Sequence, residues 1–238
     1  MILSTANSQQ LTAHCRTGAS LRGEILGAAG RLFTDYGYAA TSTRAIARMV
    51  GVRQASLYYH FSCKEDILAG LLTDAFKHAL AFAEVLQRSV QPPHIQLYAQ
   101  SYFDAATSRR DAFNTSGLYQ LPELRSERFA EFRAARDKLR AAYGEYIAAG
   151  VASGVFAPTC SAQMLTELVF AFVGGTSVVQ DGQTAGRSSA RSRSVTSARV
   201  VAVGALRVLA CRPELVTEAV CEAAALLAAS GCDHLENV

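Results

Sequence analysis

Apolar residues recur at steps of three and four along most of the chain, which is the spacing of one face of a helix. A series that begins at Leu21 and Ile25 is followed by Gly37, so the pattern predicts an amphipathic helix over residues 20–36 that a glycine ends. The sequence contains no alternating apolar and polar run of useful length, so no strand is expected. The pattern therefore predicts an all-α fold.

Two short helices follow this first one. Residues 41–43 supply hydroxyl caps in front of a helix that Gly51 ends, and a third helix is expected over about 53–60. Two short helices joined by a glycine turn, with a longer helix ahead of them, are the parts of a helix-turn-helix. We expect a DNA-binding domain over residues 19–66, preceded by a flexible arm over 1–18.

The remainder of the chain, residues 67–238, is expected to form a second helical domain. Ser62 and Glu65 have the spacing of a capping box in front of a long apolar series, so they predict the start of its first helix. A segment rich in glycine, serine and arginine, residues 182–197, predicts a loop. Further helices are expected over residues 94–108, 123–151, 161–180, 198–211 and 214–230.

The composition excludes several classes of protein. Half of the residues are apolar and 18% are charged, which is typical of a globular chain rather than a disordered one. The most apolar stretch, 168–179, is shorter than the roughly 20 residues of a membrane span. The first twenty residues lack the charge and apolar run of a secretory leader. We therefore expect a cytoplasmic protein that does not enter a membrane.

Motifs for metal binding and catalysis are missing from the sequence. The six cysteines show no C-x-x-C spacing and no cluster with histidine, so they are expected to be reduced thiols and not zinc ligands. There is no H-E-x-x-H, no G-x-S-x-G and no phosphate-binding loop. We expect no metal, no cofactor and no enzymatic activity.

Residues 1–66, which comprise the arm and the predicted DNA-binding domain, hold a surplus of three positive charges, with seven basic side chains against four acidic ones. The major groove is about 12 Å wide and admits one helix, whose N-terminal residues reach the base edges. The predicted base contacts are Arg53, Gln54, Ala55 and Ser56. Hydroxyl, phenol and amine side chains nearby suit the sugar-phosphate backbone. The predicted backbone contacts are Thr41, Ser42, Thr43, Arg44, Tyr58, Tyr59, His60 and Lys64.

Several of these residues have a structural alternative. For Tyr58 and Tyr59, the alternative to a DNA contact is that one of the two rings packs against the first helix. His60 suits a structural role as well as it suits a DNA contact. Lys64 stands in the first turn of a helix, where the helix dipole disfavours a cation, so a nearby phosphate is expected. Arg53 precedes the third helix without a side-chain acceptor, so it cannot cap that helix.

The run from Ile25 to Leu68, ILGAAGRLFTDYGYAATSTRAIARMVGVRQASLYYHFSCKEDIL, resembles the DNA-binding domain of the tetracycline-repressor (TetR) family. The matching blocks are L-F-x-x-x-G-Y, T-S-x-R-x-I-A, G-V and S-L-Y-Y-H-F-x-x-K-E. Arg53 and Gln54 depart from the pattern, which often has a small capping residue followed by lysine. The resemblance implies nine or ten helices, a homodimer and a palindromic operator from which a small molecule releases the protein.

The resemblance also places the effector among the helices that follow the DNA-binding unit. Apolar walls with a few phenol hydroxyls suit a hydrophobic or aromatic effector, although ordinary core packing is the alternative for each ring. The candidate ligand contacts are Tyr102, Phe103, Phe113, Tyr119 and Tyr143. In such a dimer the helices at 161–180 and 198–211 form the two-helix half of the interface. The competing function is a ligand-independent or architectural DNA-binding protein with a solid helical core.

Overall fold

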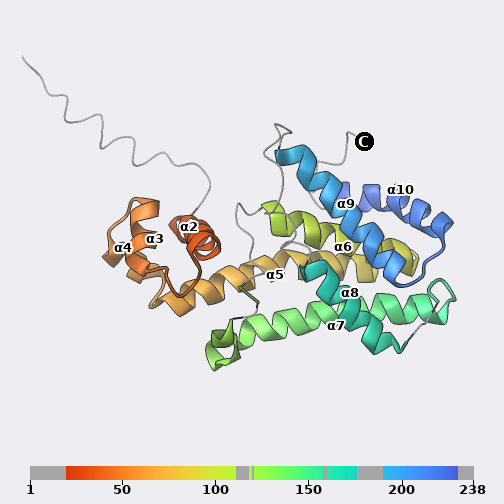
Figure 1. The fold of residues 1–238 in the computed structure, drawn as a ribbon, viewed down its shortest axis with the longest axis horizontal. Helices are drawn as coiled ribbons and strands as arrows, with labels where there is room; N and C mark the ends of the chain where they lie inside the picture. Colours follow the sequence, from red (N-terminus) through yellow and green to blue (C-terminus); the bar gives the residue numbers. More distant parts are fainter. Residues whose placement is uncertain (1–19, 111–117, 120, 158–159, 176–189, 230–238) are drawn as a thin grey trace, which may run out of the picture.

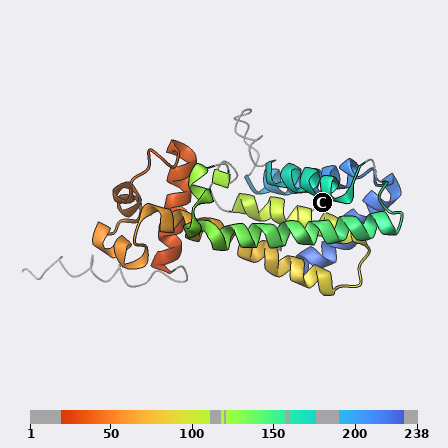
Figure 2. The same cartoon turned by 90° about the horizontal axis from the view of Figure 1, so that it is seen from below.

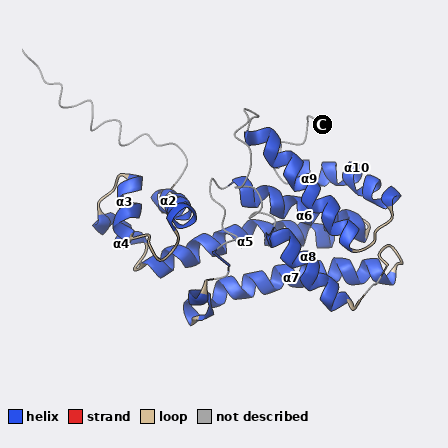
Figure 3. Cartoon of the chain, in the orientation of Figure 1, coloured by secondary structure: helices blue, strands red, loops and turns tan. Residues whose placement is uncertain are grey.

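The computed structural model describes residues 20–110, 118–119, 121–157, 160–175 and 190–229. All regular structure in these ranges is helical (Figure 3), which confirms the all-α prediction. Within the same ranges, no helix combines the length and the hydropathy that a membrane span requires. The elements are α2 (Leu21–Tyr36), α3 (Thr43–Val50), α4 (Gln54–His60), α5 (Lys64–Arg88), α6 (Pro93–Arg110), the 3-10 turns η2 (Pro122–Arg125) and η3 (Glu127–Phe129), α7 (Ala130–Ala152), α8 (Ala162–Gly175), α9 (Ala190–Val208) and α10 (Pro213–Ala229).

The helices form two groups that α5 joins (Figure 1). Helices α2, α3 and α4 make a small unit at one end, and α5 runs from this unit into the second group. There α6 and α7 pack against α5, α9 and α10 cover α6, and α8 lies against α7. Figure 2 shows α7 running along the second group from the end nearest the small unit to the far end.

Helix α5 contributes to the hydrophobic core along its whole length, because its apolar face is unbroken. Ile67, Leu68 and Leu72 are fully buried near its start, and Phe82 and Leu86 are buried near its end. Burying one such side chain contributes about 1.5–3 kcal/mol, so both halves of α5 are held firmly in the core that the two groups share. The domain boundary expected between residues 66 and 67 falls inside the first turn of this continuous helix.

The start of α5 differs from the capping box expected for Ser62 and Glu65. The N-cap is Cys63, one residue later, and its side chain makes no capping hydrogen bond. Glu65 therefore lies in the first turn, where hydrogen bonds from its own backbone N–H and from the Cys63 side chain lower its pKa. The Glu65 carboxylate thus accepts a hydrogen bond from its own backbone N–H at the helix start, and not from the N–H of Ser62 that a capping box would use.

Two other expectations about the second group were wrong. The helix expected over 123–151 begins as the two 3-10 turns η2 and η3, and α7 starts only at Ala130. The Arg133 guanidinium donates hydrogen bonds to the carbonyls of Leu124 and Ser126 at 2.8 and 2.6 Å, which stabilises the two turns in place of a continuous helix. The loop expected over 182–197 is helical from Ala190 onward. Residues 190–197 contain no glycine or proline, so nothing stops α9 from extending beyond the part that packs on α6. Residues 182–189 lie outside the described residues.

Helices α8 and α9 share an exposed apolar face, which we call the α8–α9 face. Met164, Leu168 and Phe172 recur at four-residue steps on α8 and are 56%, 51% and 37% exposed, while Val200 on α9 is 65% exposed. The two helices lie close together, because a Cβ on Gly204 would stand 2.7 Å from the Phe172 ring. Among the described residues, nothing covers these side chains of the α8–α9 face.

Helix α7 offers a matched pair of glycines for testing its packing. A Cβ on Gly150 would overlap the ring of the buried Phe156, whereas a Cβ on Gly144 would meet Thr166 at an ordinary 3.6 Å. We expect Gly150→Ala to lower the free energy of unfolding by about 1–3 kcal/mol, and Gly144→Ala to leave it unchanged or raise it by up to about 1 kcal/mol. Urea unfolding at one fixed protein concentration measures both. Equal values for the two variants would show that α7 is not packed as described.

Candidate nucleic-acid interface

Local signals in the sequence account for the geometry of α3, the turn and α4. The Ser42 hydroxyl caps α3 by accepting a hydrogen bond from the N–H of Ala45 at 3.2 Å. Gly51 ends α3 with φ +81°, a left-handed conformation that glycine adopts without strain. Ile46 and Leu57 are fully buried and hold the two short helices in the core of the small unit. The predicted helix-turn-helix is thus confirmed.

Three polar side chains join the start of α3 to α4. The amide nitrogen of Gln54 donates to the hydroxyl of Thr43 at 3.1 Å and to that of Tyr58 at 3.3 Å. The two hydroxyls lie 3.2 Å apart, so the three groups form a closed triangle. This network restricts the rotamers of Gln54 and Tyr58 before any ligand binds. It leaves the Gln54 carbonyl oxygen and the phenol of Tyr58, which is 47% exposed, close to the surface.

The outer face of the helix-turn-helix carries several of the predicted base and backbone contacts. Ser42, Arg44, Arg53 and Ala55 are exposed, and Ser56 is half-buried in the first turn of α4. Arg53 is the N-cap of α4 and makes no side-chain capping bond, as expected from its chemistry.

Tyr59 and Arg48 add to this exposed surface. Tyr59 is 88% exposed, so its ring does not pack into the core, which removes the packing alternative for this residue. Arg48 is exposed on α3 one turn after Arg44. The sequence reasoning missed Arg48, although its four-residue spacing from Arg44 places both cations on the same side of the helix.

Thr41 and Lys64 have structural roles that the sequence reasoning did not anticipate. The Thr41 hydroxyl is buried and donates to the carbonyls of Leu32 and Gly37. The Lys64 ammonium donates to the carbonyls of Tyr38 at 2.9 Å and Thr41 at 3.1 Å, and it also lies over the Tyr38 ring. Both side chains therefore hold the turn between α2 and α3. The phosphate expected near Lys64 is therefore not needed to explain a cation in the first turn of α5, because these backbone carbonyls accept its hydrogen bonds.

His60 stands apart from the exposed face. Its ring is half-buried and meets the Tyr59 ring edge-on at 5.3 Å. It also lines a cavity between α2, the turn after α4, α5 and α7. This position favours the structural alternative for His60.

The aromatic side chains predicted to bind an effector each pack against a different neighbour. Phe103 stacks on Phe82 at 4.4 Å, and Tyr102 stacks on Tyr98 at 6.2 Å. The other two described candidates also pack into the core: Tyr119 contacts the rings of Phe76 and Phe132, and Tyr143 contacts Phe170. Phe113 lies outside the described residues. The core-packing alternative thus accounts for these ring contacts.

A polar cluster between α6 and α7 was not predicted from the sequence. The Asp104 carboxylate accepts hydrogen bonds from the Gln100 amide and from the Tyr143 phenol, both at 2.8 Å. Burial raises the pKa of Asp104 to about 7, and the two hydrogen bonds oppose that rise. Gln100 also donates to the carbonyl of Ala79 on α5, so the cluster touches three helices. The signal in the sequence was one acid one turn after a glutamine, in the part of α6 that carries the buried residues Tyr102, Phe103 and Ala105.

Comparisons with known proteins agree with this geometry. Residues 25–71 match the model of the bacterial regulatory proteins of the tetR family. The crystal structure of AmtR from Mycobacterium smegmatis is 36% identical to this chain, covers 92% of it and 96% of AmtR, and superposes with a TM-score of 0.71. The chain belongs to the TetR family of transcriptional regulators. It is a DNA-binding regulator whose helix-turn-helix is α3 and α4.

Two further members of the TetR family resemble the chain over different lengths. The transcriptional repressor KstR2 of Mycolicibacterium smegmatis is 28% identical over 165 residues, 68% of this chain and 78% of KstR2. The transcriptional regulator QacR of Staphylococcus aureus is 40% identical, but over 53 residues that make up 22% of this chain and 28% of QacR. The family model itself covers only the DNA-binding end, residues 25–71.

The different environments of Lys64 and Arg44 can be separated by experiment. We expect Lys64→Met to lower the free energy of unfolding by about 1–3 kcal/mol, because it leaves buried carbonyls without a donor. It should leave the salt dependence of DNA binding unchanged. Arg44→Met should do the reverse, with stability within about 0.5 kcal/mol and a salt slope smaller by about 1. Urea unfolding and DNA titrations at several salt concentrations measure these effects. A lower salt slope without loss of stability in Lys64→Met would contradict the structural role.

Proposed function

We propose that this TetR-family regulator is a repressor that binds a palindromic operator as a homodimer and is released by a small molecule. The observation that carries the proposal is the exposed face of α3 and α4, on which Arg44 and Arg53 flank a Gln54 that is already held in place. The related KstR2 is named a repressor, which supports repression as the output. The named relatives are regulators, so an architectural role is not favoured.

The proposed DNA contacts follow from exposure and chemistry. Arg53, Gln54 and Ala55, with Ser56 beside them, would meet base edges in the major groove, since guanidinium pairs with guanine, amide with adenine and a methyl group with thymine. Backbone contacts would come from α3 and from the phenols of α4, because hydroxyls and cations near helix starts suit phosphates. These are Ser42, Thr43, Arg44, Tyr58 and Tyr59, to which the structure adds Arg48.

The α8–α9 face is the proposed dimer interface. A contiguous exposed apolar surface on a soluble chain is typical of a protein interface. Gly175 continues the same face, and a Cβ on it would meet nothing within 4 Å among the described residues, so a partner's backbone has room to approach. The face coincides with the helices that the sequence predicted for dimerisation.

The proposed effector site lies around the cluster of Gln100, Asp104 and Tyr143, between α6 and α7. It supplies the few polar groups that an otherwise apolar ligand site needs for orientation. The described aromatic candidates Tyr102, Phe103 and Tyr119 would provide the apolar walls, and Phe113 stays a candidate from the sequence alone. The bond from Gln100 to the Ala79 carbonyl gives this cluster a direct contact with α5. A ligand that prefers one position of α5 would lower operator affinity by its difference in affinity between the two states.

Selection of bound duplexes from a random DNA library tests the proposed function. With the purified protein at two salt concentrations, we expect a palindromic site whose affinity falls steeply as salt rises. Arg53→Ala should relax the preference at one position in each half-site. Recovery of no common sequence by the unaltered protein at either salt concentration would overturn the operator proposal.

Substitutions on the α8–α9 face test the dimer. We expect Leu168→Arg to raise the dimer dissociation constant at least about tenfold, because a charge would be buried without a partner. Val85→Arg is the matched control, since Val85 is 53% exposed on α5, outside this face. Sedimentation velocity over a range of protein concentrations measures both. If the two variants dimerise equally well, the interface lies elsewhere.

Asp104 makes stability depend on pH in a direction that can be checked. Its folded pKa of about 7 lies above the unfolded value of 3.8, so the folded state binds the proton more tightly. Stability from this group is therefore greatest below about pH 4 and falls as pH rises toward 7. We expect Asp104→Asn to be the more stable protein at pH 8, by up to about 4 kcal/mol, and similar at pH 4. Thermal or urea unfolding at both pH values measures the difference. A stability gap that does not change with pH would contradict the assignment.

A further inference from the structure

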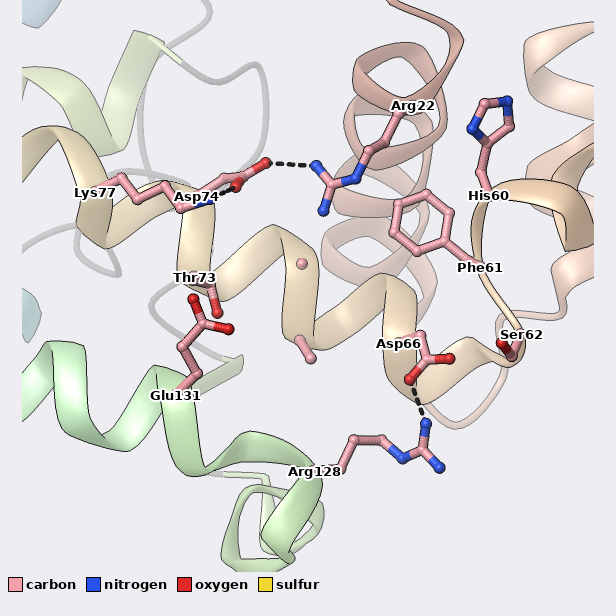
Figure 4. Close-up of a pocket in the computed structure, with 12 residues that line it drawn as sticks. Arg22, His60, Phe61, Ser62, Asp66, Thr73, Asp74, Lys77, Arg128 and Glu131 are labelled. Carbon is pink, nitrogen blue, oxygen red and sulfur yellow. Dashed lines mark hydrogen bonds and ion pairs between the residues drawn. The ribbon is translucent and has the colours of Figure 1, made fainter.

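A polar cavity of about 300 Å³ lies where the helix-turn-helix unit meets the second group of helices. Figure 4 shows side chains from α2, α5, α7 and the turn after α4 around it. On the α5 side the cavity is lined by Ala69 and Gly70, whose side chains are small or absent, and Phe61 adds an apolar wall. The volume is at the lower end of the range for small-molecule sites, so a compact metabolite would fit. This cavity is separate from the cluster around Asp104.

The charges around the cavity are balanced in number but not in position. On the α2 side, Asp74 pairs with two cations, Arg22 at 3.1 Å and Lys77 at 3.0 Å, so that group has an excess positive charge. Near the turn after α4, Asp66 pairs with Arg128, and that pair is neutral. From α7, the Glu131 side chain points toward α5 (Figure 4), and it forms no ion pair within the described part of the chain.

We propose that this cavity binds a zwitterion of the size of a free amino acid. The ammonium of the ligand would pair with Glu131, and its carboxylate would pair with Arg22 and Lys77. A simple anion would face the carboxylates of the cavity, and a simple amine would face its cations, so neither satisfies both sides. The existing pairs involve side chains that are 38–62% exposed, and such pairs contribute only about 0–1 kcal/mol, so a ligand can rearrange them at small cost.

A ligand in this cavity would contact the DNA-binding unit and the second group at once. Arg22 belongs to α2, whereas Glu131 belongs to α7, so the distance between the two charges depends on how the two groups are oriented. By linkage, the bound ligand would favour one orientation and change operator affinity. Binding itself does not depend on the proposed function, but this regulatory consequence rests on it.

Calorimetric titration of the full chain, without DNA, tests the site. The probes are the common L-amino acids, added singly at millimolar concentration, each compared with its N-acetyl and amide derivatives. We expect at least one amino acid to bind with one site per protomer, and each derivative to bind at least about tenfold more weakly because it lacks one of the two charges. Inorganic phosphate and a simple alkyl amine serve as the single-charge probes.

Variants locate the binding. Glu131→Gln and Lys77→Met should each weaken it at least about tenfold, whereas Glu84→Gln, an exposed ion-paired carboxylate of α5 outside the cavity, should leave it unchanged. Circular dichroism checks that each variant is folded. Failure of every amino acid to bind, equal binding of phosphate or the amine, or binding unaffected by both Glu131→Gln and Lys77→Met would each overturn the proposal. Because no DNA is present, any of these results leaves the operator proposal standing.

Discussion

The packing of α2 directly onto α5 at Gly70 is the constraint on which the rest of the structure depends. A Cβ at this position would lie 3.0 Å from the Arg22 guanidinium and 3.4 Å from Leu26, so side chains of α2 pack directly against the backbone of α5. Arg22 also lies over the Phe61 ring and pairs with Asp74, which adds contacts on both sides of the glycine. These contacts join the helix-turn-helix unit to α5 and define its orientation in the described structure.

A second path of contacts runs from the α7 end of the molecule to the turn after α2. Arg128 of η3 pairs with Asp66 in the first turn of α5 and donates to the Cys63 sulfur. Burial, together with the nearby charges of Glu65 and of Glu123 in η2, raises the pKa of Tyr38, which shows that η2 lies close to the DNA-binding unit. Residues of η2 and η3 therefore connect α7 to the DNA-binding unit, in addition to the connection through α5.

Local signals made part of this structure predictable from the sequence. Gly37 and Gly51 end their helices with positive φ, and Ser42 caps α3, so the helix-turn-helix could be placed almost to the residue. The capping pattern at Ser62 was off by one residue because Cys63, which lacks a strong acceptor, occupies the cap. The start of α9 was missed because the serine- and arginine-rich composition of residues 190–197 favours a loop, although that stretch contains no glycine or proline to stop a helix.

The sites beyond the DNA-binding face depend on residues far apart in the sequence. Tyr143 meets Asp104 across 39 positions, and Arg22 meets Asp74 across 52, so no local pattern indicates either pair. The role of Lys64 was likewise not predictable from local sequence, because its carbonyl partners lie more than 20 residues earlier in the chain. Periodicity identifies which residues are buried, but it does not identify which buried polar groups face each other.

The central proposal is that the α8–α9 face joins two chains, and that contacts through α6 and α7 to α5 and α2 set the separation of the two copies of α4 on the operator. Hydroxyl-radical footprinting of the full-length protein on an operator recovered from the selection tests this most directly. The account predicts two protected backbone regions on one side of the duplex, centred about 10 base pairs or a multiple of that apart, since paired recognition helices enter successive major grooves about 34–36 Å apart. A single protected region, or two regions on opposite sides of the duplex, would contradict it.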